Sequence, residues 1–304
     1  MSTESEIGMS VEQVKDLVAP DLFLPGGPVG VLLLHGLGGA PVEMRFLAQG
    51  LSRQGFTVLC PLLKAHGGSD LLLNTARWSD WVASATAAYD RLREHCDHII
   101  VCGQSAGAML GIQLAADKSR DVSGLVLCSP TFWPDGWAIP RVMQLFRIIR
   151  QRWVADLFSF SERSPYGIKD ERLRRFVLES LQQDGRPLAD IFGRKGGTIF
   201  EFRRLADDSR RKLAHVTVPT LVIHSREDDQ ASLGNALRVV RGMKGPVELI
   251  VLDDSYHLVT LDRQRGQVLD RAVSFATKLA AQVEPQAVPV KAVVAEAPRA
   301  ARQG

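Results

Sequence analysis

GQSAG at residues 103–107 lies directly between the apolar run HIIVC at residues 98–102 and a stretch of helix-forming residues. A G-x-S-x-G segment in this setting predicts a sharp turn from strand to helix, which projects the serine hydroxyl from the end of a sheet. Glycine is required at 103 and 107 because a β-carbon at either position would collide where the helix doubles back past the strand. The pentapeptide therefore predicts Ser105 as a nucleophile.

A second glycine-rich loop, HGLGG at residues 35–39, follows the strand-like run VLLL at residues 31–34. Backbone N–H groups in such a loop can face outward, and we expect those of Leu37 and Ala106 to hold the oxyanion of a tetrahedral intermediate. A nucleotide-binding loop is the competing interpretation. It fails because the third glycine of G-x-G-x-x-G falls on Pro41 and no Gly-Lys-Ser/Thr follows.

A serine hydroxyl is a weak nucleophile until a base removes its proton, so a histidine and a carboxylate are expected after later strands. The run VELIVL at residues 247–252 is typical of a strand and leads to His257, the expected base. The run PTLVIH at residues 219–224 leads to two acids, of which Asp228 is the better candidate and Asp229 the alternative. The order serine, aspartate, histidine is that of α/β-hydrolases.

These motifs resemble those of α/β-hydrolases of the bacterial carboxylesterase and monoacylglycerol-lipase group. Five segments carry the likeness: LLHGLGG at 33–39, HGG at 66–68, WSDW at 78–81, GQSAG at 103–107 and SYHLVTLD at 255–262. In that group the last segment carries the catalytic histidine, which implies the base role for His257. The resemblance covers roughly residues 28–128 and 216–280. It departs from the group at Asp229, where such enzymes often have proline or an apolar residue, and in the shortness of the segment before the first strand.

Alternating strand and helix patterns predict an α/β-hydrolase fold, with a mostly parallel sheet of about six or seven strands and helices on both faces. Strands are expected near residues 29–34, 56–60, 98–102, 122–128, 219–224 and 247–252, and helices near 41–54, 79–95, 105–117, 231–242 and 263–281. The domains expected are an N-terminal segment at 1–24, a core at 25–129 and 216–282, a helical lid inserted at 130–215, and a disordered Ala/Pro/Val-rich tail at 283–304. No strand-like run is evident from 131 to 215.

The lid is basic, with 17 Lys and Arg against 11 Asp and Glu over residues 131–215, a net charge of +6. Its apolar side chains are expected either to pack on the sheet or to line an acyl pocket. Its arginines either face solvent or attract an acidic substrate or an anionic lipid surface. We expect Phe132 and Trp133, which lie just past a strand end, to contact the substrate together with Gly36 and Gln104.

The composition is that of an ordinary globular protein: 304 residues, 45% hydrophobic and 23% charged, enough for a large core without disulfides. The four cysteines fall in or beside predicted strands and helices and are expected as buried thiols. No signal peptide pattern and no apolar run near ~18 residues is present, so we expect a cytoplasmic protein. We expect no cofactor, no bound metal and no nucleic-acid partner.

The sequence thus predicts a serine hydrolase that cleaves small acyl esters or monoacylglycerol-like lipids through an acyl-enzyme intermediate. The same triad could instead transfer the acyl group to an alcohol or amine, or cleave thioesters. An alternative of a different class is a non-catalytic binding protein on the same scaffold. Labelling by a serine-directed fluorophosphonate probe would exclude that alternative.

Overall fold

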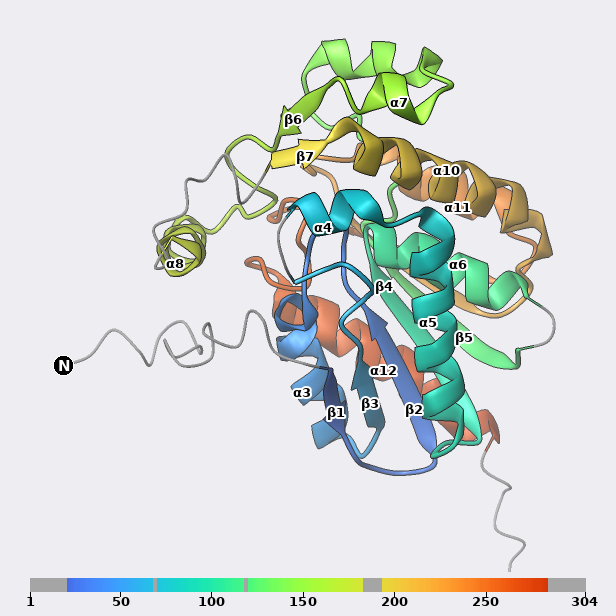
Figure 1. The fold of residues 1–304 in the computed structure, drawn as a ribbon. Coiled ribbons are helices and arrows are strands. Elements are labelled where there is room, and N and C mark those ends of the chain that lie inside the picture. The colour runs from blue at the N-terminus through green and yellow to red at the C-terminus, as the bar shows by residue number, and fades with distance from the viewer. Residues whose placement is uncertain (1–20, 68–69, 118–119, 183–192, 284–304) are drawn as a thin grey trace, which may run out of the picture.

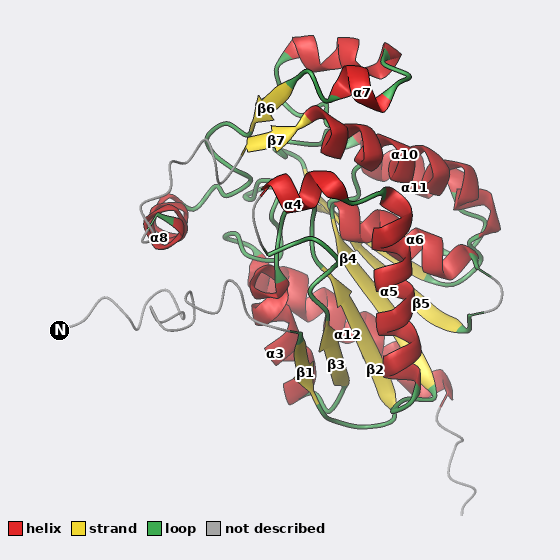
Figure 2. Cartoon of the chain, in the orientation of Figure 1, coloured by secondary structure: helices red, strands yellow, loops and turns green. Residues whose placement is uncertain are grey.

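A seven-stranded sheet forms the centre of the computed structural model, which describes residues 21–67, 70–117, 120–182 and 193–283 (Figures 1 and 2). Its strands are β1 (Leu22–Leu24), β2 (Val29–Leu34), β3 (Thr57–Cys60), β4 (His98–Gln104), β5 (Val122–Cys128), β8 (Thr220–Ser225) and β9 (Val247–Leu252). They lie in the order β1-β3-β2-β4-β5-β8-β9, and every neighbouring pair except β1 and β3 is parallel. The mostly parallel α/β architecture predicted from the sequence is confirmed.

The order of the strands creates a crevice beside β2. The chain moves from β2 to β3 on one side and then crosses back to β4 on the other side. In parallel sheets, ligands bind at such a switch point, beyond the carboxyl ends of the strands. The glycine-rich loop at 35–39 leaves β2 and the pentapeptide at 103–107 leaves β4, and Leu34 lies opposite Gly103 in the register of these two strands. Two motifs far apart in sequence therefore meet at the crevice.

Helices cover both faces of the sheet (Figure 1). On one face lie α3 (Arg45–Arg53) and α12 (Arg265–Val283), and on the other α5 (Trp78–Arg93), α6 (Ala106–Ala116), α10 (Gly196–Lys212) and α11 (Gly234–Gly242). Successive side chains of a strand point to opposite faces, so Leu32 joins the core under α5 and α6 whereas Leu33 joins the core under α3 and α12. All six residues of β2 are buried, as expected for a strand covered on both sides.

The segment between β5 and β8, called the insertion and described at residues 130–182 and 193–215, lies over the carboxyl ends of the strands (Figure 1). Besides α10 it contains η3 (Arg141–Ile148), α7 (Arg152–Ala155), β6 (Ser159–Ser161), α8 (Glu171–Leu181), β7 (Gly193–Lys195) and η4 (Leu213–His215). β6 and β7 pair in an antiparallel ribbon, although no strand was expected in this region. Three residues per strand are too few for an alternating pattern to be recognised in the sequence. That the insertion acts as a lid stays a prediction.

A buried carboxylate ties the insertion to the core. Glu201 of α10 is fully buried and accepts hydrogen bonds of 3.0 Å from both Arg77 Nη1 and Arg152 Nη1. It also accepts one of 3.2 Å from the N–H of Trp78, the first residue of α5. A buried charge is tolerated when it is paired and hydrogen-bonded in this way. The contacts join α5, α7 and α10 at one point.

Outside the insertion, two short elements were not expected from the sequence. One is β1, an edge strand that pairs antiparallel with β3, so the segment expected at 1–24 contributes to the sheet. The other is α4 (Asp70–Thr75), whereas the helix expected near 41–54 begins with the 3-10 turn η2 (Pro41–Met44) and continues as α3. The remainder of the N-terminal segment, residues 1–20, and the tail expected to be disordered, at 284–304, lie outside the described residues.

All four cysteines, at positions 60, 96, 102 and 128, are buried and carry free thiols, in agreement with the expectation from their places in the sequence. In the part of the chain that the structure describes, no helix combines the length and the apolar character needed to cross a membrane.

Candidate active site

Ser105 lies on a tight turn between β4 and α6, with a φ of 55° and a ψ of −111°. A positive φ is strained for a residue other than glycine and persists only where the surroundings fix it. Here the surroundings are glycines: a β-carbon at Gly103 would lie 2.2 Å from the carbonyl oxygen of Gly107, and one at Gly107 would lie 2.0 Å from that of Leu34. The close approach of helix and strand thus holds the Ser105 side chain at the carboxyl end of the sheet.

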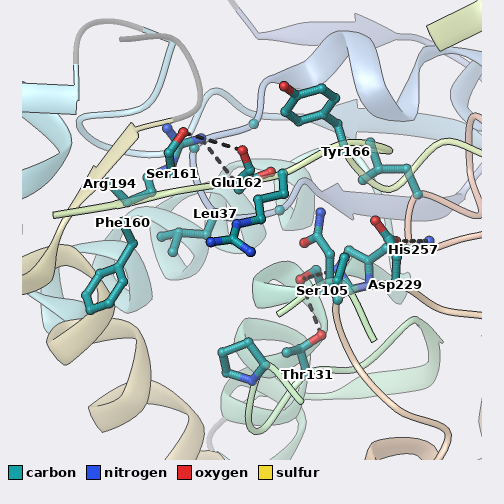
Figure 3. A pocket seen from close by; sticks show the side chains of 18 of the residues that line it. Leu37, Ser105, Thr131, Phe160, Ser161, Glu162, Tyr166, Arg194, Asp229 and His257 are labelled. Carbon is teal, nitrogen blue, oxygen red and sulfur yellow. Dashed lines mark hydrogen bonds and ion pairs between the residues drawn. The ribbon is translucent and has the colours of Figure 1, made fainter. Parts of the chain in front are cut away.

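Ser105, His257 and Asp228 form a line of hydrogen bonds at this end of the sheet. The imidazole Nε2 of His257 lies 2.9 Å from Ser105 Oγ (Figure 3), and its Nδ1 lies 2.8 Å and 3.0 Å from the two carboxylate oxygens of Asp228. The side chains of His257 and Asp228 are 3% and 0% exposed. The structure therefore brings together the serine, histidine and preferred aspartate that the sequence selected, each from a different strand end.

Backbone groups fix the carboxylate of Asp228. Its Oδ1 accepts hydrogen bonds of 2.9 Å from the N–H of Gln230 and 2.8 Å from that of Ala231. His224, at the end of β8, lies 3.4 Å away and hydrogen-bonds the Ala231 carbonyl. Burial lowers the pKa of His224, so this imidazole is neutral beside the carboxylate. Its hydrogen bond to the Ala231 carbonyl ties the end of β8 to the loop that carries Asp228.

The electrostatics favour an ion pair when His257 takes up a proton. Burial alone would lower the pKa of His257, but the charge and hydrogen bond of Asp228 outweigh it and raise the pKa above its ordinary value. Burial would likewise raise the pKa of Asp228, but His257 opposes this, and the pKa lies below its ordinary value. Asp228 is thus ionised, and His257 has a raised affinity for a proton.

The backbone of His257 is held by side chains that the sequence did not point to in this role. Its carbonyl oxygen accepts hydrogen bonds of 2.9 Å from Gln104 Nε2 and 2.8 Å from Ser129 Oγ, at the ends of β4 and β5. Its N–H donates to Asp229 Oδ1 at 3.2 Å. Of the two adjacent aspartates, Asp228 therefore contacts the imidazole ring and Asp229 the backbone.

Two backbone N–H groups are available beside Ser105. Ala106 is the first residue of α6, so its N–H has no acceptor within the helix and lies at the positive end of the helix dipole. The loop that carries Leu37 comes close to the nucleophile, since a β-carbon at Gly36 would lie 3.7 Å from Ser105 Cβ. No described residue accepts a hydrogen bond from the N–H of Leu37 or Ala106. The arrangement can receive a negative charge that develops on a substrate oxygen.

A cavity of 690 Å³ opens over Ser105 and His257, between the strand ends and the insertion. Gly36 and Leu37 form part of its wall. Much of the remaining wall is apolar and comes from two regions. These side chains are Ile139, Val142, Met143, Phe160, Val177, Leu178, Leu181, Ile199 and Phe202 of the insertion, with Leu258 and Leu261 after His257. Such a wall suits the hydrocarbon part of a ligand.

One side of the cavity is charged. Arg194 of β7 forms a 3.6 Å ion pair with Glu162 and packs against the glycine-rich loop, where a β-carbon at Gly38 would lie 2.3 Å from its Nη2 (Figure 3). The Glu43 carboxylate packs against Gly39 of the same loop, where a β-carbon would lie 2.4 Å from its oxygens. Burial raises the pKa of Glu43 to about 7. Sequence patterns gave no sign of this group, because Glu43 lies more than a hundred residues before Glu162 and Arg194.

Three of the four residues expected to contact substrate are placed elsewhere. Gly36 lines the cavity, but Gln104 lies behind Ser105 and bonds the His257 carbonyl. Phe132 and Trp133 are 4% and 5% exposed and belong to hydrophobic cores instead. Their backbone N–H groups donate to the side-chain oxygen of Asn235, and neither residue lines the cavity. Thr131, directly before them, is the residue that lines it, 3.4 Å from Ser105 Oγ.

Within the residues that the structure describes, no group of three or more His, Cys, Asp or Glu side chains is arranged to hold a metal ion.

Comparison with known proteins places this geometry in context. The family model described as serine aminopeptidase, S33, within the Hydrolase_4 group, matches residues 29–264. A thermostable monoacylglycerol lipase of Bacillus sp. (strain H-257) is 29% identical over 261 residues, which cover 86% of this chain and 95% of the lipase. A carboxylesterase of Bacillus subtilis (strain 168) is 24% identical over 267 residues, covering 86% of this chain and 98% of the esterase.

Solved structures give the same architecture. One from work on LipS and LipT, two metagenome-derived lipolytic enzymes, superposes with a TM-score of 0.71 at 28% identity, covering 86% of this chain and 98% of that one. The monoacylglycerol lipase of Paleococcus ferrophilus superposes with a TM-score of 0.67 at 16% identity, covering 85% and 98% of the two chains. At that identity the second likeness concerns the fold alone.

Proposed function

Because the chain belongs to the serine aminopeptidase S33 family of α/β-hydrolases, we propose that it is a carboxylic ester hydrolase that works through an acyl-enzyme on Ser105. The observation that carries the proposal is the 2.9 Å contact between Ser105 Oγ and His257 Nε2, continued to Asp228 on the far side of the ring. Relatives that are a monoacylglycerol lipase and a carboxylesterase support esters as the substrate class.

In the first half of the reaction Ser105 Oγ attacks the acyl carbonyl carbon while His257 Nε2 takes the hydroxyl proton. Asp228 holds the imidazole in the tautomer that presents a bare Nε2 to the serine and stabilises the imidazolium that forms. The tetrahedral intermediate then collapses, and His257 returns the proton to the departing alkoxide. The alcohol leaves, and the acyl group remains on Ser105.

In the second half His257 removes a proton from water, and the resulting hydroxide attacks the acyl-enzyme. A second tetrahedral intermediate releases the carboxylic acid and restores the Ser105 hydroxyl. In both halves the N–H groups of Leu37 and Ala106 are the proposed oxyanion donors. Each would lower the barrier by roughly 3 kcal/mol, by analogy with other oxyanion donors.

The cavity supports esters with a substantial hydrocarbon part. Its volume is 690 Å³, and apolar side chains, many of them from the insertion, form much of its wall. We therefore assign the acyl chain of small esters or monoacylglycerol-like lipids to this space, with the insertion as its lid. Profiling p-nitrophenyl esters from acetate to palmitate tests this, because a cavity of this kind should favour chains longer than acetate.

Two other outcomes of the same chemistry are distinguished by the products. Acyl transfer would require that an alcohol or amine intercept the acyl-enzyme, and product analysis with added acceptors detects it. Thioester cleavage would require that turnover of an acyl-CoA exceed that of the p-nitrophenyl ester with the same acyl chain. Neither is favoured by a specific feature of the cavity over hydrolysis of esters.

The outer surface of the insertion fits an anionic lipid surface, from which such substrates would be drawn. Ile148, Trp153 and Leu157 are 78%, 68% and 74% exposed. Arg147, directly before Ile148, and Arg150, between Ile148 and Trp153, are also exposed. Apolar side chains that enter a bilayer interface beside arginines that meet its negative charge are the usual elements of a peripheral lipid contact.

Vesicle sedimentation tests the lipid contact. The protein should sediment with phosphatidylglycerol vesicles more than with phosphatidylcholine vesicles, and the Trp153→Ala/Leu157→Ala variant should lose this binding while it hydrolyses a soluble ester normally. Phe23→Ala is the matched control, since Phe23 is 42% exposed on β1, away from the insertion. If the double variant binds the vesicles as well as the wild type does, the lipid contact is refuted. It is also refuted if gel filtration shows that the double variant sediments less only because its self-association has changed.

The serine-directed fluorophosphonate probe is the direct test of the main proposal. The wild type should be labelled at Ser105 and lose its esterase activity in proportion. Ser105→Ala should be neither labelled nor active while its circular dichroism spectrum is unchanged. A protein that is folded yet unlabelled would be a binding module on this scaffold.

A further inference from the structure

A closed ring of hydrogen bonds joins Asp229, the His257 turn and the insertion. One carboxylate oxygen of Asp229 accepts the His257 N–H at 3.2 Å, and the other accepts the Gly167 N–H at 2.9 Å. The ring closes through the Gly167 carbonyl, which accepts the N–H of Leu258 at 2.8 Å. Asp229 is fully buried. One carboxylate therefore fixes the backbone that carries the imidazole to a segment of the insertion.

The segment of the insertion is shaped for this contact. Gly167 has a φ of +77°, a conformation that glycine adopts at little cost. A β-carbon there would lie 3.2 Å from His257 Cβ and 3.0 Å from Leu258 Cγ. Residue 167 thus packs directly on the histidine, and a larger residue would push against it.

A second buried carboxylate, that of Asp262, also joins the histidine turn to the insertion. Asp262 Oδ2 accepts the N–H of Tyr256 at 2.7 Å and that of Lys169 at 2.9 Å, and its Oδ1 accepts that of Asp170 at 2.9 Å. Tyr256 therefore donates its N–H to Asp262, and His257 donates its N–H to Asp229. Each of these carboxylates also accepts a hydrogen bond from the insertion. The turn has little freedom to move away from the segment at 167–170.

We propose that Asp229 is a positioning residue for His257: it places the imidazole for proton transfer by holding the histidine backbone against the insertion. The proposal rests on the function proposed above. It also assigns a role to the second aspartate of the pair, which departs from the pattern of the resembling group. Asp229 does not contact the ring, so it acts through the position and the electrostatic environment of His257.

The charge of Asp229 contributes a second, measurable effect. Burial raises the pKa of Asp229 to about 6, and the neighbouring Asp228 adds to the rise. At neutral pH the carboxylate is therefore ionised and accepts both bonds. Its negative charge in turn helps to raise the pKa of His257, together with Asp228 on the same loop and Glu162 of the insertion. Glu43 and His224 also interact electrostatically with His257.

Asp229→Asn is the central test, because asparagine has the same shape but only one acceptor oxygen, and its NH2 group would face a backbone N–H. With p-nitrophenyl butyrate, kcat per fluorophosphonate-titrated site should fall by about tenfold to a hundredfold, as expected for a small misplacement of the base. KM should change much less. The acid limb of the kcat/KM profile should move to lower pH, because the pKa of His257 falls when the charge is removed.

Glu227→Gln is the matched control. It removes a negative charge two residues away and a contact with Lys169 of the insertion, but Glu227 has no bond to the histidine turn. Its kcat should match the wild type. If kcat per titrated site in Asp229→Asn also matches the wild type, or if the acid limb stays in place, the positioning role is refuted while labelling of Ser105 leaves the proposed function intact.

Gly167→Ala tests the ring from the insertion side and does not depend on the folding of the first variant. It should lower kcat per titrated site as well, since the added methyl presses on His257. Because both substitutions act through one ring, the double variant should lose less than the product of the two single losses. Fully multiplicative losses would mean that the two residues act independently, which contradicts the proposal.

Discussion

Gly107 lies so close to Leu34 that a β-carbon on it would fall 2.0 Å from the Leu34 carbonyl oxygen. The first turn of α6 is thereby pressed against the end of β2. This contact brings the N–H of Ala106 and the loop at 35–39 to the same side of Ser105, and it leaves no room for any other residue at position 107.

Gly107→Ala should reduce kcat per folded molecule by more than about a hundredfold, since the helix must move to admit the methyl group and the serine moves with it. Gly111→Ala, one turn further along α6, is the control. Its methyl would meet side chains of Val101, Leu125 and Leu127 at 3.5–3.7 Å, which is ordinary contact. Activity with p-nitrophenyl butyrate and the thermal midpoint Tm should stay near wild type in that control, and equal effects of the two substitutions would contradict the account.

Asp228→Asn should lower kcat on the order of 10⁴-fold, the loss that follows when the tautomer of a triad histidine is no longer fixed. The wild-type acid limb of kcat/KM should lie above the ordinary histidine pKa, because Asp228 raises the pKa of His257. Since the imidazole must be neutral to act as a base, activity falls as the pH drops through this value. In the variant, the acid limb of the remaining kcat/KM activity should move to lower pH. If it does not move, Asp228 does not raise the pKa of the group that titrates.

Glu201→Ala should destabilise the protein by about 3–5 kcal/mol, because it removes the buried carboxylate from the Arg152 guanidinium, whose side chain is only 16% exposed, and from the N–H of Trp78. Asp207→Ala on the same helix is the control. Asp207 is 50% exposed, and its pair with Arg210 spans 3.9 Å, so it should cost no more than about 1 kcal/mol. Urea unfolding followed by circular dichroism measures both. Similar costs for the two variants would mean that the Glu201 cluster is no stronger than a surface pair.

Glu43→Gln should stabilise the protein relative to wild type more at pH 8 than at pH 5. The pKa of Glu43 in the folded protein is about 7, raised from its ordinary 4.5, so its contribution to stability is full below about 4.5 and is lost as the pH rises through about 7. Glutamine does not titrate and loses nothing over this range. The difference in Tm between variant and wild type should therefore grow with pH, and a constant difference would show that Glu43 does not titrate there. Asp229 titrates in both the variant and the wild type, so its effect on Tm cancels in the difference between them.

The sequence was sufficient for the parts of the fold and site that depend on strong local patterns. The six long strands are apolar runs with turn residues behind them, and the three residues now joined by hydrogen bonds follow three of these runs. Because parallel strands place their carboxyl ends at one edge, residues that follow such runs are brought together by the topology itself. The need for glycine at 103 and 107 could also be predicted from the sequence, because few residues other than glycine fit where two backbones approach so closely.

The remainder depended on contacts between distant segments. Two adjacent aspartates are alike in sequence, and only the course of the loop decides that Asp228 contacts the imidazole and Asp229 the backbone N–H. Phe132 and Trp133 follow a strand end, yet their side chains belong to hydrophobic cores, and their backbone N–H groups bond to Asn235, about a hundred residues later. Arg194 meets the loop at 35–39 through a ribbon of three-residue strands. None of these partners has a local signature.

The hydrogen bonds on the His257 carbonyl come from residues 104 and 129, so this arrangement of His257 exists only after segments more than a hundred residues apart have docked. Long-range closures of this kind are slow steps in folding, whereas helices form early. During refolding from denaturant, ester turnover should consequently lag behind the recovery of helical signal, which makes enzyme activity a gauge of complete chain assembly rather than of secondary-structure content.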